Sequence, residues 1–179
     1  MRPTINLQDL PIGDKFPEIC TVVIEIPKGS RNKIEYREDT GTFELDRVLY
    51  SAQFYPTDYG FIPQTRDEDG DALDAMVLTT IPLFTGCTLE ARAIGLMEMV
   101  DGGEVDDKIL FVPTGDPRFA SIKTIDDVDP HTLKEIANFF QTYKLLQNKE
   151  VKIEGWHGLD KATEVIKKCY ELEQKGSTK

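Results

Sequence analysis

The central part of the chain, residues 21 to 154, consists of short apolar runs separated by segments rich in turn residues. The runs TVVIEI, AMVL, ARAIGLMEMV, KILFV and VKIEG are typical of β-strands, and the segments KGSRN, DEDGD and DGGE are typical of turns. Many short strands joined by frequent turns are characteristic of small barrels. The pattern therefore predicts a small β-barrel.

Helical periodicity appears only late in the sequence. Asp129 can cap a helix with Pro130 in its first turn. The apolar stripe of this helix would consist of Leu133, Ile136, Ala137 and Phe140. A second helix is expected over residues 161–173, with Gly176 as its stop signal. Two helices in the C-terminal half that cover a barrel predict the α+β class.

Length and charge narrow the class of protein. The 179 residues fit one domain, 1–179, and 40% apolar with 30% charged residues is typical of a globular protein. The formal net charge of −11 argues against general binding to nucleic acid, because phosphates would repel such a surface. A basic pocket within an acidic body is still compatible with this charge.

The cysteines and the N-terminal sequence indicate the compartment. Cys20, Cys87 and Cys169 are far apart, odd in number and without CxxC spacing, so we expect reduced thiols and no zinc ribbon. The sequence MRPTINLQDL lacks the apolar core of a signal peptide, and no later run is long enough to cross a membrane. These features predict a cytoplasmic protein that does not associate with membranes.

An acidic cluster occupies DEDGDALDAMV, residues 67–77, with five acidic side chains in eight positions. Unit charges about 5 Å apart repel by roughly 3 kcal/mol at an effective dielectric of 20. Gly70 permits a tight bend that brings Asp69, Asp71 and Asp74 together, and a hard divalent cation would neutralise them. The segment taken alone favours the simpler alternative, a solvated acidic turn.

Two other acidic motifs fit this segment less well. With Gly70 at the sixth position of an EF-hand loop, Thr65 and Met76 fall at the end positions, where ligands are required. A phosphatase-type DxD nucleophile would follow an apolar strand, whereas IPQTRDED is polar and contains a proline.

A second acidic segment, MVDGGEVDDK, places Asp101 and Asp106 on either side of a Gly-Gly turn. A hairpin would bring both acids to one rim, although an ordinary charged hairpin loop explains the segment equally simply. His131 and His157 show no metal-ligand spacing. An oxygen-only ligand set favours Mg²⁺, Mn²⁺ or Ca²⁺ over zinc.

Some charged residues lie within strand patterns. Alternation places Glu25 on the face of Val23, and it places Arg47 on an apolar face with Phe43, Leu45 and Leu49. A charge that points into a barrel needs a partner, so Arg47 is the harder residue to explain. In KIEYR, the residues Lys33, Glu35 and Arg37 share one side, which in isolation is read as a solvated stripe.

Two pairs of polar aromatic or basic residues could also face a pocket. Tyr55 and Tyr59 lie in the constrained segment QFYPTDYGFIP, and core packing is expected for at least one of them. Tyr143 and Lys144 follow the first predicted helix, where the tyrosine can be part of the buried stripe and the lysine can extend to water.

In this order, VVIEIP, KIEY, DR, FYPTDYGFIP, DGDALD, DGGEVDDK and YK resemble the soluble inorganic pyrophosphatases built on an OB-type barrel. The resemblance covers roughly residues 18 to 156, and DGDALD is its most specific part. It implies a closed OB-type barrel and Mg²⁺-dependent hydrolysis of pyrophosphate to two phosphates, with Mn²⁺ as an alternative metal. The modest length of the chain resembles that of the short prokaryotic members of the family, and this resemblance implies a homohexamer.

The resemblance also implies roles for individual residues. Asp71 would be the general base for a metal-bound water. Metals would be bound, directly or through waters, by Asp69, Asp74, Asp106, Asp101, Glu25 and Glu35. Phosphates would be bound by Lys33, Arg47, Tyr59, Lys108, Tyr143 and Lys144, with Tyr55 and Lys149 as weaker assignments. Ala72 and Gly102 depart from residues that are usual in the family.

Two alternatives stay open on the sequence alone. The acidic cluster also suits a different metal-dependent phosphohydrolase or a nuclease. A non-catalytic OB module that binds divalent ions or oligonucleotides is the other alternative, although the negative charge and few aromatic residues disfavour nucleic acid.

Overall fold

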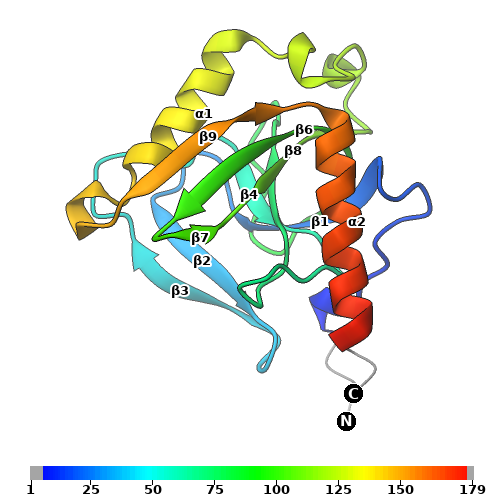
Figure 1. Cartoon of the computed structure of the whole chain (residues 1–179), viewed down its shortest axis with the longest axis horizontal. Helices are drawn as coiled ribbons and strands as arrows, with labels where there is room; N and C mark the ends of the chain where they lie inside the picture. Colours follow the sequence, from blue (N-terminus) through cyan, green and yellow to red (C-terminus); the bar gives the residue numbers. More distant parts are fainter. Residues whose placement is uncertain (1–5, 177–179) are drawn as a thin grey trace.

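The computed structural model describes residues 6–176, and residues 1–5, which include half of the N-terminal stretch discussed above, lie outside this description. Short strands dominate the described chain, as the sequence predicts, and two α-helices lie in its C-terminal part with β9 between them (Figure 1). The strands are β1 (Ile19–Ile26), β2 (Asn32–Arg37), β3 (Thr42–Val48), β4 (Asp58–Phe61), β5 (Asp74–Val77), β6 (Thr88–Asp101), β7 (Glu104–Val105), β8 (Lys108–Pro113) and β9 (Val151–His157). The helices are α1 (Pro130–Thr142) and α2 (Leu159–Gly176), with short 3-10 turns η1 (Leu7–Asp9), η2 (Pro117–Phe119), η3 (Ile125–Asp127) and η4 (Leu145–Gln147).

Five strands pair in a ring. Strand β1 pairs with β4, β4 with β5, β5 with β8, β8 with β6, and β6 returns to β1. Only β5 and β8 are parallel among these pairs. Strand β6 is the longest and pairs with β1 along its first part and with β9 along its last part. The result is a mixed, sheet-dominated fold with two helices.

Strand β4 was not among the predicted strands. Its segment contains proline and glycine, and all four of its residues are buried, so the alternation that marks a half-buried strand is absent. Gly60 allows β4 to lie in this buried position, because the backbone of β4 passes very close to that of β1 at this residue. A Cβ atom on Gly60 would lie 1.8 Å from the carbonyl oxygen of Val23.

Gly60→Ala is expected to destabilise the fold by about 3 kcal/mol, because the added methyl group forces the backbones of β1 and β4 apart. Urea denaturation followed by circular dichroism measures this change. Gly115→Ala is the matched control, since a Cβ atom there meets nothing within 4 Å, and it should change stability by less than about 0.5 kcal/mol. Equal stability of the two variants would contradict the proposed close approach.

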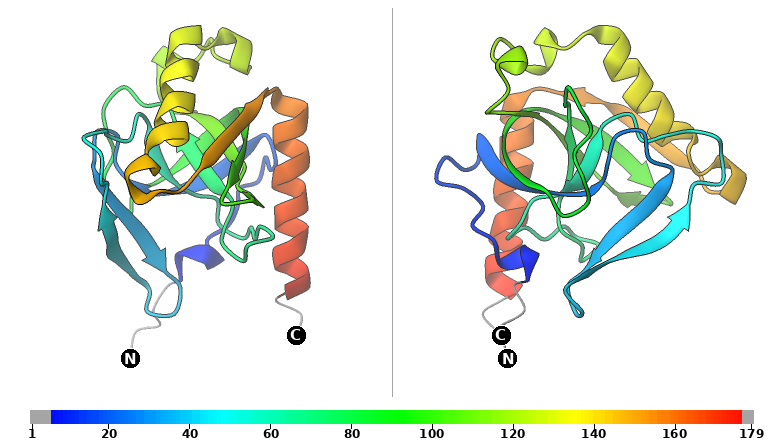
Figure 2. Two further views of the ribbon diagram at one scale, coloured as in Figure 1. Left: turned by 60° about the vertical axis from the view of Figure 1, so that its left-hand side comes forward. Right: turned by 180° about the vertical axis from the view of Figure 1, so that it is seen from behind.

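Strands β2 and β3 form a separate two-stranded sheet beside the ring (Figure 2). The predicted apolar face of β3 was wrong at Leu45, which is 59% exposed. A register shift between Lys33 and Ile34 is one reason, since Lys33 pairs with Arg47 while Ile34 pairs with Leu45, which interrupts the alternation. The hairpin also lies outside the ring, so its second face is not buried.

The helices pack on two different hydrophobic clusters. Helix α1 begins where predicted, with Asp129 accepting backbone hydrogen bonds at its N-terminus, and it packs Ile136, Phe139 and Phe140 into one cluster. Helix α2 is longer than predicted and packs its buried residues against the strands of the other cluster. Within residues 6–176, neither helix has the long apolar stretch that a membrane crossing requires.

Candidate active site

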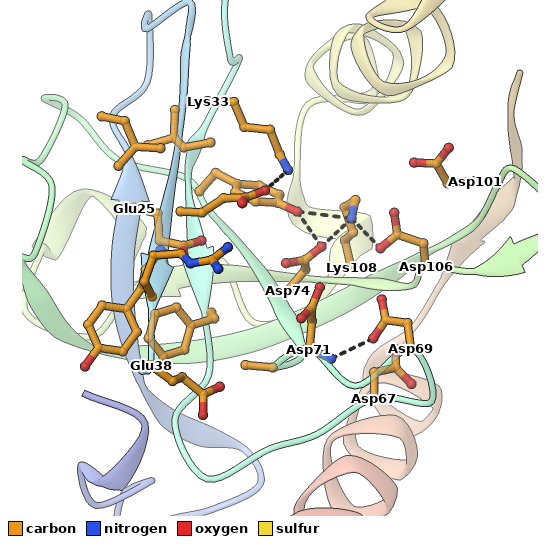
Figure 3. A pocket seen from close by; sticks show the side chains of 18 of the residues that line it. Glu25, Lys33, Glu38, Asp67, Asp69, Asp71, Asp74, Asp101, Asp106 and Lys108 are labelled. Carbon is orange, nitrogen blue, oxygen red and sulfur yellow. Dashed lines mark hydrogen bonds and ion pairs between the residues drawn. The ribbon is translucent and has the colours of Figure 1, made fainter. Parts of the chain in front are cut away.

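One cavity of about 590 Å³ lies between the hairpin β2–β3, the loop before β5 and the hairpin β6–β7. Predicted site residues from distant parts of the sequence meet here (Figure 3). They are Glu25, Lys33, Glu35, Tyr59, Asp69, Asp71, Asp74, Asp101, Asp106, Lys108, Tyr143 and Lys144. The fold therefore brings the predicted site residues to a single cavity, except Arg47 and the two weaker assignments, Tyr55 and Lys149.

Lys108 lies among the acidic side chains and is only 1% exposed. Its Nζ atom lies 2.5 Å from Asp74 Oδ2 and 2.8 Å from Asp106 Oδ1, and it donates to the Tyr59 hydroxyl at 3.1 Å (Figure 3). The strand register explains this position. Strands β5 and β8 run parallel and begin side by side, with Asp74 paired to Lys108.

Burial and the charge of Lys108 determine the protonation of this group. Burial raises the pKa of Asp74 to about 6, although the nearby ammonium opposes the shift. Burial acts in the same direction on Asp106, but Lys108 outweighs it and holds the pKa of Asp106 below its ordinary value. Burial disfavours the charge on Lys108, yet the two carboxylates overcome this effect and raise its pKa. Lys108 is therefore a charged counter-ion at neutral pH.

The loop before β5 presents a row of acids to the same cavity. The backbone N–H of Asp71 donates to Asp69 Oδ1 at 2.9 Å, and the backbone N–H of Asp67 donates to the Asp71 carbonyl at 2.7 Å. Gly70 makes this tight loop possible with a φ of +93°. Burial raises the pKa of Asp71, and the charges of Asp69 and Glu35 add to the shift.

Strands β1 and β2 supply another wall of the cavity. Glu25 Oε1 accepts a hydrogen bond from the Tyr36 backbone N–H at 2.7 Å. Burial raises the pKa of Glu25 to about 8, although this hydrogen bond opposes the shift. Glu35 forms an ion pair with Lys33, and Lys33 Nζ also lies 3.6 Å from Asp46 Oδ2. The expected solvated stripe on β2 is instead part of the cavity wall.

The segment that follows α1 completes the cavity with one phenol and one ammonium group. Tyr143 is 4% exposed and packs against Phe139 and Phe140, as expected for a residue of the buried stripe. Lys144 forms an ion pair with Asp101. Burial lowers the pKa of Lys144, although Asp101 opposes this shift.

Arg47 does not line the cavity but contacts its wall. The guanidinium pairs with Asp46, whose carboxylate lies near the ammonium of Lys33. Its side chain is 22% exposed, and its Nε atom is buried without a hydrogen-bond partner. The sequence pattern predicted that Arg47 points into a barrel, but Arg47 lies on the hairpin β2–β3 beside the ring, where its partner is the neighbouring Asp46.

The weaker assignments and the departures lie close to the site. Tyr55 is 2% exposed and packs in the core against Tyr59. Ala72 lines the main cavity. Lys149 and Gly102 line a neighbouring cavity of about 550 Å³, which shares two residues with the first.

Some acidic residues of the cavity were not singled out from the sequence. Asp67 and Asp107 line it, and each lies within one of the two acidic segments of the sequence. Their charge alone could have indicated them. Glu38 also lines the cavity, but it lies in the turn after β2 and nothing in the sequence pattern marks it.

The donor set of this cavity suits a hard divalent cation, because the available ligands are carboxylate, hydroxyl and carbonyl oxygens. Within residues 6–176, no three acidic, histidine or cysteine side chains converge closely enough to hold a metal ion as they stand. Lys108 lies between two of these acids, Asp74 and Asp106, and pairs with both of them. A bound cation would compete with this ammonium for the same carboxylates.

A mixed-charge cavity with many carboxylates and several ammonium groups is typical of metal-dependent enzymes that act on phosphate esters or anhydrides. Comparison with known proteins identifies the family within this class. The family model described as inorganic pyrophosphatase matches residues 22–174. The chain belongs to the inorganic pyrophosphatase family, and it is a hydrolase.

Relatives match along nearly the whole chain. The inorganic pyrophosphatase of Nostoc sp. is 48% identical over 162 residues, which cover 90% of this chain and 95% of the relative. That of Thermus thermophilus is 48% identical over 167 residues, covering 92% and 95%. A crystal structure of inorganic pyrophosphatase from Thermus thermophilus superposes with a TM-score of 0.92 at 47% identity, covering 95% of this chain and 99% of that one. This family implies a divalent metal cofactor.

Proposed function

We propose that the chain hydrolyses inorganic pyrophosphate to two orthophosphates and uses Mg²⁺ as its divalent metal, with Mn²⁺ as an alternative. Family membership supports the reaction. The observation that supports the site is the convergence of acidic and basic side chains from five separate stretches of sequence on one cavity. Such a mixture suits a compact polyanion that must be neutralised on several sides.

The carboxylates are proposed to bind the metals. Asp69, Asp74 and Asp106 would hold the activating ions, and Asp101 would help to bind one that arrives with the substrate. When bound, these ions supply positive charge against the phosphates and lower the pKa of water at the site. The rest of the reaction depends on side chains of the chain itself.

The basic and phenolic groups are proposed to bind the phosphates. Lys33 and Lys144 line the cavity on different elements, and both are partly exposed, so a phosphate group can approach them. In the free protein they pair with Glu35 and Asp101, respectively. A more highly charged phosphate would compete with these carboxylates and would draw the two ammonium groups together around the leaving group.

Asp71 is proposed to be the general base. Asp71 is exposed and lines the cavity, so water can reach its carboxylate. The raised pKa of its carboxyl group brings its basicity nearer to neutral pH, which favours removal of a proton from the attacking water. Glu25 and Glu35 are proposed to hold waters of the metals rather than to act on the substrate.

Further proposals follow from the family and the strand pairing. The ring of strands is proposed to be a closed barrel of the OB type, and residues 1–179 to act as one domain. The protein is proposed to work in the cytoplasm as a homohexamer, with no nucleic acid or membrane as a partner. The strand pairing supports the barrel, and the net negative charge argues against nucleic acid as a partner.

The purified chain is expected to release two phosphates from each pyrophosphate when Mg²⁺ is present and to fall to background after chelation with EDTA. A colorimetric phosphate assay measures both. Nucleotides and oligonucleotides, assayed in parallel, are expected to give at least about 100-fold lower rates, because the many charged side chains that line the cavity match the dense charge of pyrophosphate better than that of a nucleotide.

Each alternative function predicts a different result from this assay. Faster hydrolysis of a nucleotide or oligonucleotide would replace the proposal with another phosphohydrolase or a nuclease. Binding of Mg²⁺ by calorimetry without phosphate release from any of these compounds would indicate a module that only binds metal.

A further inference from the structure

The side chain of Arg66 contacts three separate elements beside the cavity. Its Nε donates to Glu173 Oε2 in α2 at 2.8 Å. Its Nη1 and Nη2 donate to the two carboxylate oxygens of Glu38, in the turn between β2 and β3, at 2.8 and 3.2 Å. Nη1 also donates to the backbone carbonyl of Gly70 at 2.8 Å. One guanidinium group therefore joins α2, the hairpin and the acidic loop.

The contact with Gly70 acts on the backbone that orients the acids. Gly70 lies between Asp69 and Asp71, and its φ of +93° belongs to the left-handed region. The loop is closed by a hydrogen bond from the Gly70 N–H to the Asp67 carbonyl at 3.1 Å. Arg66 adds its hydrogen bond to the Gly70 carbonyl, so it helps to fix the loop backbone from which the acidic side chains extend.

The backbone of Arg66 is fixed as well. Its N–H donates to the carbonyl of Cys169 in α2 at 2.9 Å. The side chain is only 26% exposed, and a planar guanidinium with several donors loses little freedom for each bond it makes. Arg66 is thus a rigid connection between helix α2 and the acidic loop.

We infer that Arg66 is a positioning residue that holds the acidic loop, residues 67–71, and the tip of hairpin β2–β3 in the arrangement that binds divalent cations. The inference rests on the proposed function for the roles of Asp69 and Asp71. Arg66 itself does not line the cavity, so it acts through the groups it contacts.

A direct electrostatic role would have the opposite effect on cation binding. Removing a positive charge beside an acidic cavity strengthens cation binding if Arg66 acts only as a counter-charge. Removing a residue that orients the ligands weakens binding, and loss of such supporting contacts typically costs 10- to 100-fold in metal affinity. The sign of the change therefore separates the two roles.

The test measures Mg²⁺ binding to the free protein by isothermal titration calorimetry in Arg66→Gln, which loses the charge, and Arg66→Lys, which keeps it. Both are expected to bind Mg²⁺ at least about 10-fold more weakly, because neither can bond all three partners. Lys168→Gln is the matched control. Lys168 bonds the Glu68 side chain of the same loop at 2.6 Å but contacts no loop backbone, and it should stay within about twofold of wild type.

Several outcomes would overturn the inference. The first is unchanged or tighter Mg²⁺ binding by Arg66→Gln. The second is a loss of Mg²⁺ affinity by Lys168→Gln equal to that of Arg66→Gln. The third is a lower melting temperature of the Arg66 variants combined with normal Mg²⁺ binding at temperatures where they are folded. If Arg66→Gln does not fold, Arg66→Lys decides the question by the same criterion.

The phosphate assay of the wild type keeps the two proposals separate. Normal pyrophosphate hydrolysis with unaltered Mg²⁺ binding in the Arg66 variants would remove the positioning role alone. If the wild type does not hydrolyse pyrophosphate but the Arg66 variants bind Mg²⁺ more weakly than it does, the proposed reaction alone is wrong.

Discussion

Asp71→Ala is expected to lower kcat for pyrophosphate by about 10²- to 10⁴-fold, the range that a general base contributes. Binding of Mg²⁺ to the free protein should stay close to wild type, because the activating ions are assigned to other carboxylates. The carboxyl group of Asp71 has a raised pKa and an exposed position at the cavity, which suit removal of a proton from water. Steady-state phosphate release and calorimetry measure the two effects.

Asp74→Ala provides the contrast to this variant. Asp74 is bonded to Tyr59 and Lys108 and is assigned to the metals, so its loss should weaken both Mg²⁺ binding and turnover. Near-normal phosphate release by Asp71→Ala would refute the assigned base. Equal loss of Mg²⁺ affinity in the two variants would instead make Asp71 a ligand.

The acidic loop and the acidic hairpin could be predicted from the sequence because each depends on a local turn. Glycine identifies both turns, and the hairpin forms as expected, with Val100 paired to Val105. The local pattern cannot say that the two segments meet. They meet because β5 and β8, which are separated by residues 78–107, pair in parallel. The sequence of neither strand indicates which other strand it pairs with.

The position of Lys108 was the least predictable feature of the site. It follows two aspartates and begins an apolar strand, so the sequence indicates only a lysine near an acidic rim. Parallel pairing with β5 buries it between Asp74 and Asp106 instead. Leu45 was mispredicted for a related reason, because burial of a strand face depends on partners that the strand's own alternation does not reveal.

Lys108→Met is expected to lower the unfolding free energy by about 3 kcal/mol at pH 8 in EDTA, because it leaves two carboxylates without their buried counter-charge. Mg²⁺ should restore more stability to this variant than it adds to wild type, since a cation then meets no competing ammonium. Urea denaturation with EDTA or Mg²⁺ measures both effects. Lys152→Met removes a lysine from an exposed ion pair with Glu154 and should behave as wild type.

The pH dependence of this deficit has a defined sign. Burial already raises the pKa of Asp74 to about 6 with Lys108 present, and removal of the ammonium raises it further. A carboxyl group whose pKa is higher in the folded than in the unfolded protein favours folding at low pH, and this contribution is lost as the pH rises through the folded value. The deficit of Lys108→Met should therefore grow as the pH rises through 6 and above, and a part of it should already be present at pH 5, because Lys108 holds the pKa of Asp106 below its ordinary value and Asp106 also loses its counter-charge. A deficit that is constant from pH 5 to 8, or one that Mg²⁺ does not reduce, would mean that Lys108 stabilises the protein by packing rather than by charge.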